Sequence, residues 1–250
     1  AFAYEFGVDP YSPYQPLQKA LDSIAWTAAS GSLTVKAAFA AIPGGAGAAV
    51  SLTGTADSLR SLVRDKTPAE LQAINAASLL KMGIPDSLAK VFLNNFTYDP
   101  QEQTLLVGEL ANMKTRGKDL FIVAACSANQ ESMAVYMRVM AQLIAIYNQK
   151  FGTAERFVDI DGLPFLQKTD GTVVGIFPVD YVSWTQRFAQ KEMAVSAAIM
   201  KMPNVKGKEL WIAGAVTPTA RKALEAKGWK IEERFGEALL REMVAKGMAK

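Results

Sequence analysis

A long run of small residues with almost no charge constrains the first quarter of the chain. Between Asp22 and Asp57 the only charged residue is Lys36, and alanine and glycine dominate the run. Pro43-Gly44-Gly45 interrupts it with a strong turn signal. We therefore expect two apolar helices within residues 17–63, which are joined at this turn and pack closely because their faces carry mainly Ala and Gly.

The uncharged stretch over residues 37–56 has the length of a bilayer span, so contact with lipid or with a partner is the alternative to a buried hairpin. The stretch contains few large apolar side chains, which makes its insertion into lipid unfavourable. Its glycines complete neither a dinucleotide-binding motif nor a P-loop, and no cofactor is expected.

Residues 1–16 combine aromatic residues with Pro10, Pro13 and Pro16, a spacing that disfavours a helix and predicts an extended arm. The rings of this arm should dock either on the body of the same molecule or on a neighbouring molecule. The predicted partner interface consists of arm residues and hairpin-turn glycines: Phe2, Tyr4, Phe6, Tyr11, Tyr14, Gly44, Gly45 and Gly47.

Helix start signals follow in series. Thr67-Pro68-Ala69-Glu70 is a capping box with proline at the first helical position, and it predicts a helix to about residue 82. Pro85 begins a short second helix, and Asp99-Pro100 begins a third that ends near residue 113. Residues 120–126 are apolar and fit either a strand or the start of a helix.

A long helix is predicted over residues 129–150, and it is apolar nearly all round, which places it in the core. Arg138 of this helix should form an ion pair at the edge of its apolar surface. Three methionines of this helix could instead line a pocket for an apolar ligand, because methionine adapts to irregular shapes: Met133, Met137 and Met140.

After Gly152 the hydrophobic period changes from helical to alternating. Strands are expected over residues 157–160 and 172–177, with a hairpin at Asp170-Gly171. Asp180 should cap a helix with an apolar stripe over residues 184–202. A parallel β-α-β unit then spans residues 209–232, and an amphipathic helix covers residues 235–250.

These patterns predict an α+β protein that is mainly α: an arm over residues 1–16, an Ala/Gly-rich helical domain over 17–150, and a smaller α/β domain over 151–250. The helical and α/β domains could also form one continuous globule.

The chain has no histidine and one cysteine, Cys126, which excludes catalytic triads with histidine, most zinc sites and an intrachain disulfide. Asp159 and Asp161 are two residues apart and could hold a divalent cation from one face of a strand, although solvent-facing aspartates at a turn are the alternative. A carboxylate-based hydrolase could also use Asp180 or Glu109.

The net charge of +3 does not indicate specific nucleic-acid binding, although a basic final fifth of the chain could touch anionic membrane surfaces. The sequence starts without methionine, which favours an exported, periplasmic or extracellular protein and leaves a cytoplasmic location open. We therefore predict a non-catalytic structural or interaction protein that assembles with a protein partner or with itself through its arm and hairpin. The alternatives are a carrier of an apolar small molecule or lipid, and a carboxylate-based hydrolase.

Overall fold

The computed structural model describes residues 56–152 and 154–236, and these form parts of two compact units. The helical unit comprises Ala1–Met113 and Ala125–Arg138, and the sheet unit comprises Lys114–Ala124 and Val139–Lys250. The arm, the hairpin turn and the closing helix predicted from the sequence lie outside the described residues. Of the described chain 54% is helix and 19% is strand, which confirms the α+β, mainly α class.

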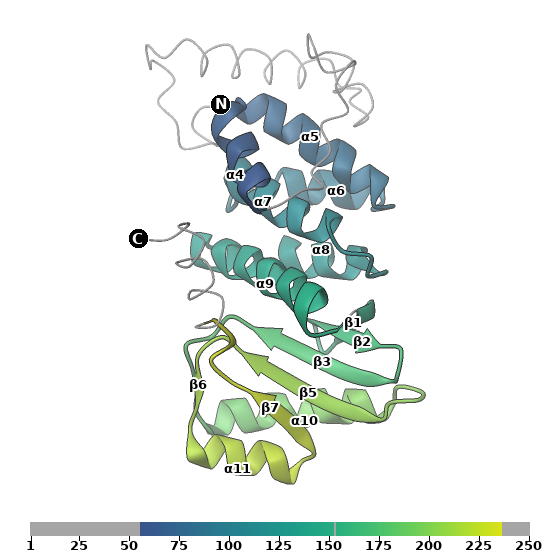
Figure 1. Cartoon of the computed structure of the whole chain (residues 1–250), viewed down its shortest axis with the longest axis vertical. Helices are drawn as coiled ribbons and strands as arrows, with labels where there is room; N and C mark the ends of the chain where they lie inside the picture. Colours follow the sequence, from purple (N-terminus) through teal and green to yellow (C-terminus); the bar gives the residue numbers. More distant parts are fainter. Residues whose placement is uncertain (1–55, 153, 237–250) are drawn as a thin grey trace. The chain divides into compact units, whose positions relative to one another are not determined.

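The helical elements include the three that were predicted from start signals at Thr67, Pro85 and Asp99. Their bounds are α4 Ala56–Asp65, α5 Pro68–Lys81, α6 Asp86–Leu93, α7 Pro100–Ala111, α8 Lys118–Cys126 and α9 Glu131–Lys150 (Figure 1). The side chain of Thr67 accepts from the Glu70 backbone N–H, and the Glu70 side chain accepts from the Thr67 N–H, so the predicted capping box forms. Residues 118–126 are a helix, which resolves the strand-or-helix alternative for this segment.

The helical unit is held together by close contacts between short helices. The inner faces of α5, α6 and α7 bury Leu71, Phe92 and Leu106. A Cβ atom at Gly108 on α7 would collide with the side chain of Leu59 on α4, so glycine permits these two helices to approach closely. Arg138 forms its expected ion pair at 2.8 Å, and the partner is Glu102.

The sheet unit contains a five-stranded mixed sheet in the order β1-β2-β3-β5-β7, and a two-stranded sheet of β4 and β6. The elements are β1 Ala154–Ile160, β2 Leu163–Lys168, β3 Thr172–Phe177, β4 Tyr181–Val182, α10 Gln186–Met200, β5 Gly207–Ile212, β6 Ala215–Val216, α11 Pro218–Ala226 and β7 Trp229–Glu232. Strands β1, β2 and β3 pair antiparallel, whereas β3, β5 and β7 pair parallel. The predicted parallel β-α-β unit is thereby confirmed.

Two local predictions in this unit were wrong. The strand before the Asp170-Gly171 turn is β2, and not the predicted strand over residues 157–160. A second tight turn at Asp161-Gly162, where both residues have positive φ, already reverses the chain after β1. Asp180 precedes β4 and does not cap a helix. The cap of α10 is Thr185, whose side chain accepts a hydrogen bond from the Phe188 N–H.

Helices α10 and α11 cover one face of the sheet, and α8 with the second half of α9 lies on the other (Figure 1). Under α10 and α11 the apolar core includes Val195, Ile199, Leu210 and Ile231. On the other face the rings of Phe121 on α8 and Phe157 on β1 lie 5.6 Å apart. The boundary between the compact units falls within α8 and α9, so these helices belong in part to the unit that contains the sheet.

Candidate functional site

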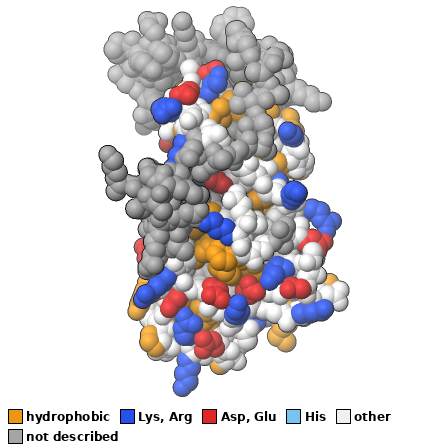
Figure 2. Space-filling view, viewed as in Figure 1, with side chains coloured by type: hydrophobic (Ala, Val, Ile, Leu, Met, Phe, Trp, Pro, Cys, Tyr) orange, Lys and Arg blue, Asp and Glu red, His pale blue; other side chains and the backbone are white. Residues whose placement is uncertain are grey.

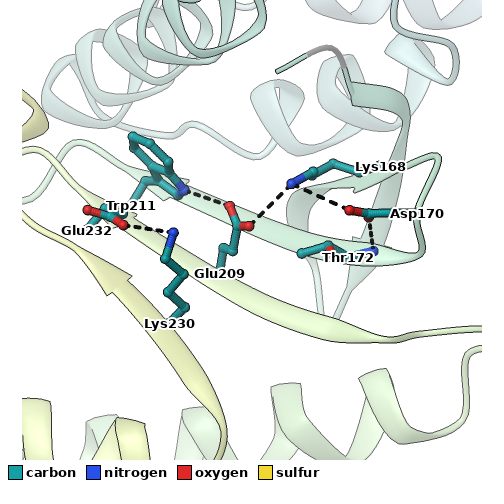
Figure 3. Close-up of polar contacts among 7 residues, drawn as sticks. All are labelled: Lys168, Asp170, Thr172, Glu209, Trp211, Lys230 and Glu232. Carbon is teal, nitrogen blue, oxygen red and sulfur yellow. Dashed lines mark hydrogen bonds and ion pairs between the residues drawn. The ribbon is translucent and has the colours of Figure 1, made fainter. Parts of the chain in front are cut away.

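Strands β5 and β7 present polar and aromatic side chains on the sheet face opposite α10 and α11. Successive side chains of a strand point to opposite faces. Leu210 and Ile212 enter the core under the helices, so Glu209 and Trp211 point to the other face. On β7, Lys230 stands opposite Glu209 in the strand register, and Glu232 stands opposite Trp211 (Figure 3).

Four aromatic rings form a continuous cluster beside these strands. The Trp211 ring lies 5.0 Å from Tyr147, 4.9 Å from Phe151 and 5.3 Å from Phe235. Phe151 and Phe235 are themselves 5.4 Å apart and nearly perpendicular. Edge-to-face geometry of this kind is favoured by aromatic quadrupoles. Phe151 keeps 50% of its surface exposed, so the cluster presents a ring to solvent.

These residues border a hollow of about 540 Å³. Its volume is within the range of ligand-binding clefts, roughly 300–1,000 Å³. In Figure 2, hydrophobic side chains lie next to a row of acidic and basic side chains on the visible face. The lining consists of four aromatic and six charged residues: Tyr147, Phe151, Trp211, Phe235, Lys168, Lys230, Arg234, Glu209, Glu232 and Glu233.

The carboxylates of the hollow are already bonded to residues of the sheet unit. Glu209 accepts from Trp211 Nε1 at 3.1 Å and from Lys168 Nζ at 3.3 Å (Figure 3). Lys230 Nζ lies 3.0 Å from Glu232 Oε1. Glu233 accepts from the Val216 N–H at 2.9 Å and pairs with Arg221 at 3.1 Å. These pairs fix the side chains that surround the rings.

Two groups that line the hollow, Tyr147 and Lys230, have pKa values shifted away from neutral pH. Burial raises the pKa of Tyr147 far above the ordinary value of a phenol, and the negative charges of Glu209 and Asp170 raise it further. The hydrogen bond to Glu232 and its charge raise the pKa of Lys230. A general base is most effective when its pKa lies near the working pH. Neither Tyr147 nor Lys230 is therefore suited to act as a general base near neutral pH.

The candidate metal pair is occupied by local bonds. Asp159 Oδ1 accepts from the Gly162 N–H at 2.8 Å, which closes the turn between β1 and β2. Asp161 Oδ2 lies 2.7 Å from Lys191 Nζ on α10. Within residues 56–152 and 154–236, no group of three or more potential ligands is arranged to hold a metal ion. Asp159 therefore closes the turn, and Asp161 links the turn to α10.

The candidate ligand methionines are not gathered at the hollow. Met137 and Met140 are 5% and 1% exposed, whereas Met133 is 46% exposed on the first turn of α9. The predicted interface residues of the arm and hairpin turn are Phe2, Tyr4, Phe6, Tyr11, Tyr14, Gly44, Gly45 and Gly47, and all lie outside the described residues.

The sequence prediction missed the hollow itself. The alternation Glu209-Leu210-Trp211-Ile212 was a usable signal, because it places a carboxylate and an indole on one face of a strand whose other face is apolar. Tyr147, Phe151 and Phe235 carried no comparable signal, since their meeting depends on how α9 and the end of β7 fold over the sheet.

Comparison with protein-family models, with curated proteins and with solved structures found no match. Across the described residues, we find no helix that combines the length and the hydropathy needed to cross a bilayer.

Proposed function

We propose that this protein is a non-catalytic structural or protein-interaction component that assembles with a partner chain or with further copies of itself. The observation that carries the proposal is the aromatic hollow of the sheet unit, whose carboxylates are bonded internally and whose exposed ring is Phe151. Aromatic side chains supply much of the binding energy at protein interfaces because they bury a large area at a low entropic cost.

The N-terminal arm and the small-residue hairpin remain the proposed contact elements on the other side of such an interface. Their aromatic rings and glycines are features that an isolated monomer needs least.

A second candidate is a carrier of an apolar small molecule, and the volume of the hollow supports it. A cleft of this size would hold such a molecule against the four rings. The hydrolase alternative gains no comparable support, because Asp159 bonds within its turn and Asp161 pairs with Lys191.

Native mass spectrometry of the protein purified from its own cells tests these functions, with a denatured measurement on the same sample. A discrete oligomer or a complex with another protein, without excess mass on the denatured chain, is the expected result. A monomer with a few hundred extra daltons that vanish on denaturation would replace the proposal with the carrier. A bare monomer at every concentration tested would contradict both.

A further inference from the structure

The sequence of residues 10–16 repeats with a period of three residues. Their sequence is Pro-Tyr-Ser-Pro-Tyr-Gln-Pro, with prolines at 10, 13 and 16 and tyrosines at 11 and 14. A polyproline II helix has three residues per turn, so the prolines would form one edge and the tyrosines another. Its backbone carbonyls make no internal hydrogen bonds and are free to accept them from a binding surface.

The hollow of the sheet unit has the chemistry that receives such a segment. Proline-rich segments bind grooves lined with aromatic rings, where a preformed conformation limits the entropy lost on binding. Phe151, Trp211 and Phe235 lie in mutual contact at the hollow. Phe151 is half exposed, which leaves one ring available to stack against a proline or tyrosine ring. Lys230, on the strand beside these rings, pairs with Glu232, and its ammonium group has three N–H donors, so it can also donate to a bound segment.

Charge distinguishes this segment from residues 237–250 at the other end of the sequence. The hollow is lined by three basic and three acidic residues, so these charges balance. Residues 10–16 contain no charged side chain, whereas residues 237–250 contain five. Burying a charged side chain without a matched partner is costly, so a balanced aromatic hollow favours the uncharged segment.

We infer that the aromatic hollow of the sheet unit binds residues 10–16 of this chain in a polyproline II conformation. The inference deepens the proposed function and rests on it for one point, that the segment comes from a second copy. Each copy would then offer both the segment and the hollow, a head-to-tail interface that forms rings or filaments.

Photo-crosslinking of the full chain tests the contact directly. Phe151→p-benzoylphenylalanine places a reactive ring at the exposed edge of the hollow. The matched control is Tyr181→p-benzoylphenylalanine, because Tyr181 is an exposed aromatic residue of the same unit and does not line the hollow. Trypsin releases residues 1–19 as one peptide, since Lys19 is the first basic residue.

The expected product links position 151 to the peptide 1–19, and the control at position 181 should not give it. Changing Pro10, Pro13 and Pro16 to alanine should weaken binding by roughly tenfold and reduce this product, because the unbound segment becomes more flexible. A link from position 151 to residues 237–250, or no link to 1–19, would overturn the inference.

The size of the crosslinked species on a denaturing gel separates the two proposals. A product with the mass of two chains supports both the docking site and the proposed assembly. A product with the mass of one chain supports the docking site and contradicts assembly through it. If the protein is oligomeric but no link forms between position 151 and peptide 1–19, the result agrees with the proposed function and contradicts this inference.

Discussion

Replacement of Glu109 should change how the stability of the helical unit depends on pH. Glu109 lies half-buried on α7. Burial raises its pKa to about 7, although the positive charges of Arg138 and Arg60 lower it in part. Between pH 4.5 and 7 the folded unit therefore retains a proton that the unfolded chain has lost. Stability falls as the pH rises through this window, and the loss is complete above about pH 7.

The magnitude follows from the two pKa values. A carboxyl pKa that rises from 4.5 to about 7 on folding corresponds to roughly 3 kcal/mol. Because Glu109 is only half-buried, partial solvation reduces this, and we expect about 2 kcal/mol. Glu109→Gln keeps the shape of the side chain and removes its charge. The variant should be about 2 kcal/mol more stable than the parent at pH 8.5 and nearly equal to it at pH 4.5.

Hydrogen exchange of peptides from α7 measures this difference for the helical unit alone. Comparing both proteins at the same pH cancels the pH dependence of intrinsic exchange. At pH 8.5 the α7 amides of the variant should exchange roughly thirtyfold more slowly. Glu131→Gln, at an exposed position at the start of α9, controls for the loss of one negative charge. If the exchange rates of Glu109→Gln and the parent differ by the same factor at both pH values, or if the variant exchanges faster at pH 8.5, the reasoning is refuted.

Four further substitutions test the packing. Glu192 is buried and accepts from Ser196 Oγ and Trp229 Nε1, so Glu192→Ala should cost about 3 kcal/mol by leaving those donors unpaired. Denaturant unfolding followed by tryptophan fluorescence measures it, and a loss below about 1 kcal/mol would contradict the assigned role. Asn75 is buried, and neither side-chain amide atom has a partner within the described residues. Asn75→Leu should therefore stabilise the helical unit by about 1–2 kcal/mol, and a lower melting temperature would show that the amide is bonded. Gly171 has φ 87°, and an added Cβ would collide with the Asn204 carbonyl. Gly171→Ala should cost at least about 2 kcal/mol in a thermal melt, against about 1 for Gly162→Ala, where φ is positive and the space is open. Equal losses of stability in Gly171→Ala and Gly162→Ala would show that the collision with the Asn204 carbonyl is relieved.

The candidate site shows where sequence reasoning stops. Strand β5 was predicted, and its alternation already implied that Glu209 and Trp211 share a face. The partners of Trp211 come from far along the chain: Tyr147 and Phe151 from the end of α9, and Phe235 from the residues after β7. No local pattern specifies that these rings meet. The spacing of Asp159 and Asp161 predicted a candidate cation site, yet their carboxylates are bonded to Gly162 and Lys191.

Helices and strands that depend on interactions between residues close in the chain could be predicted from the sequence. The capping box at Thr67, the start of α7 at Pro100 and the parallel β-α-β unit all follow from interactions within a few residues or from a single hydrophobic period. The helical state of residues 118–126 and the hollow follow only from the tertiary structure. Both depend on which distant surface a segment is buried against, and burial is a property of the whole fold that short stretches of sequence do not encode.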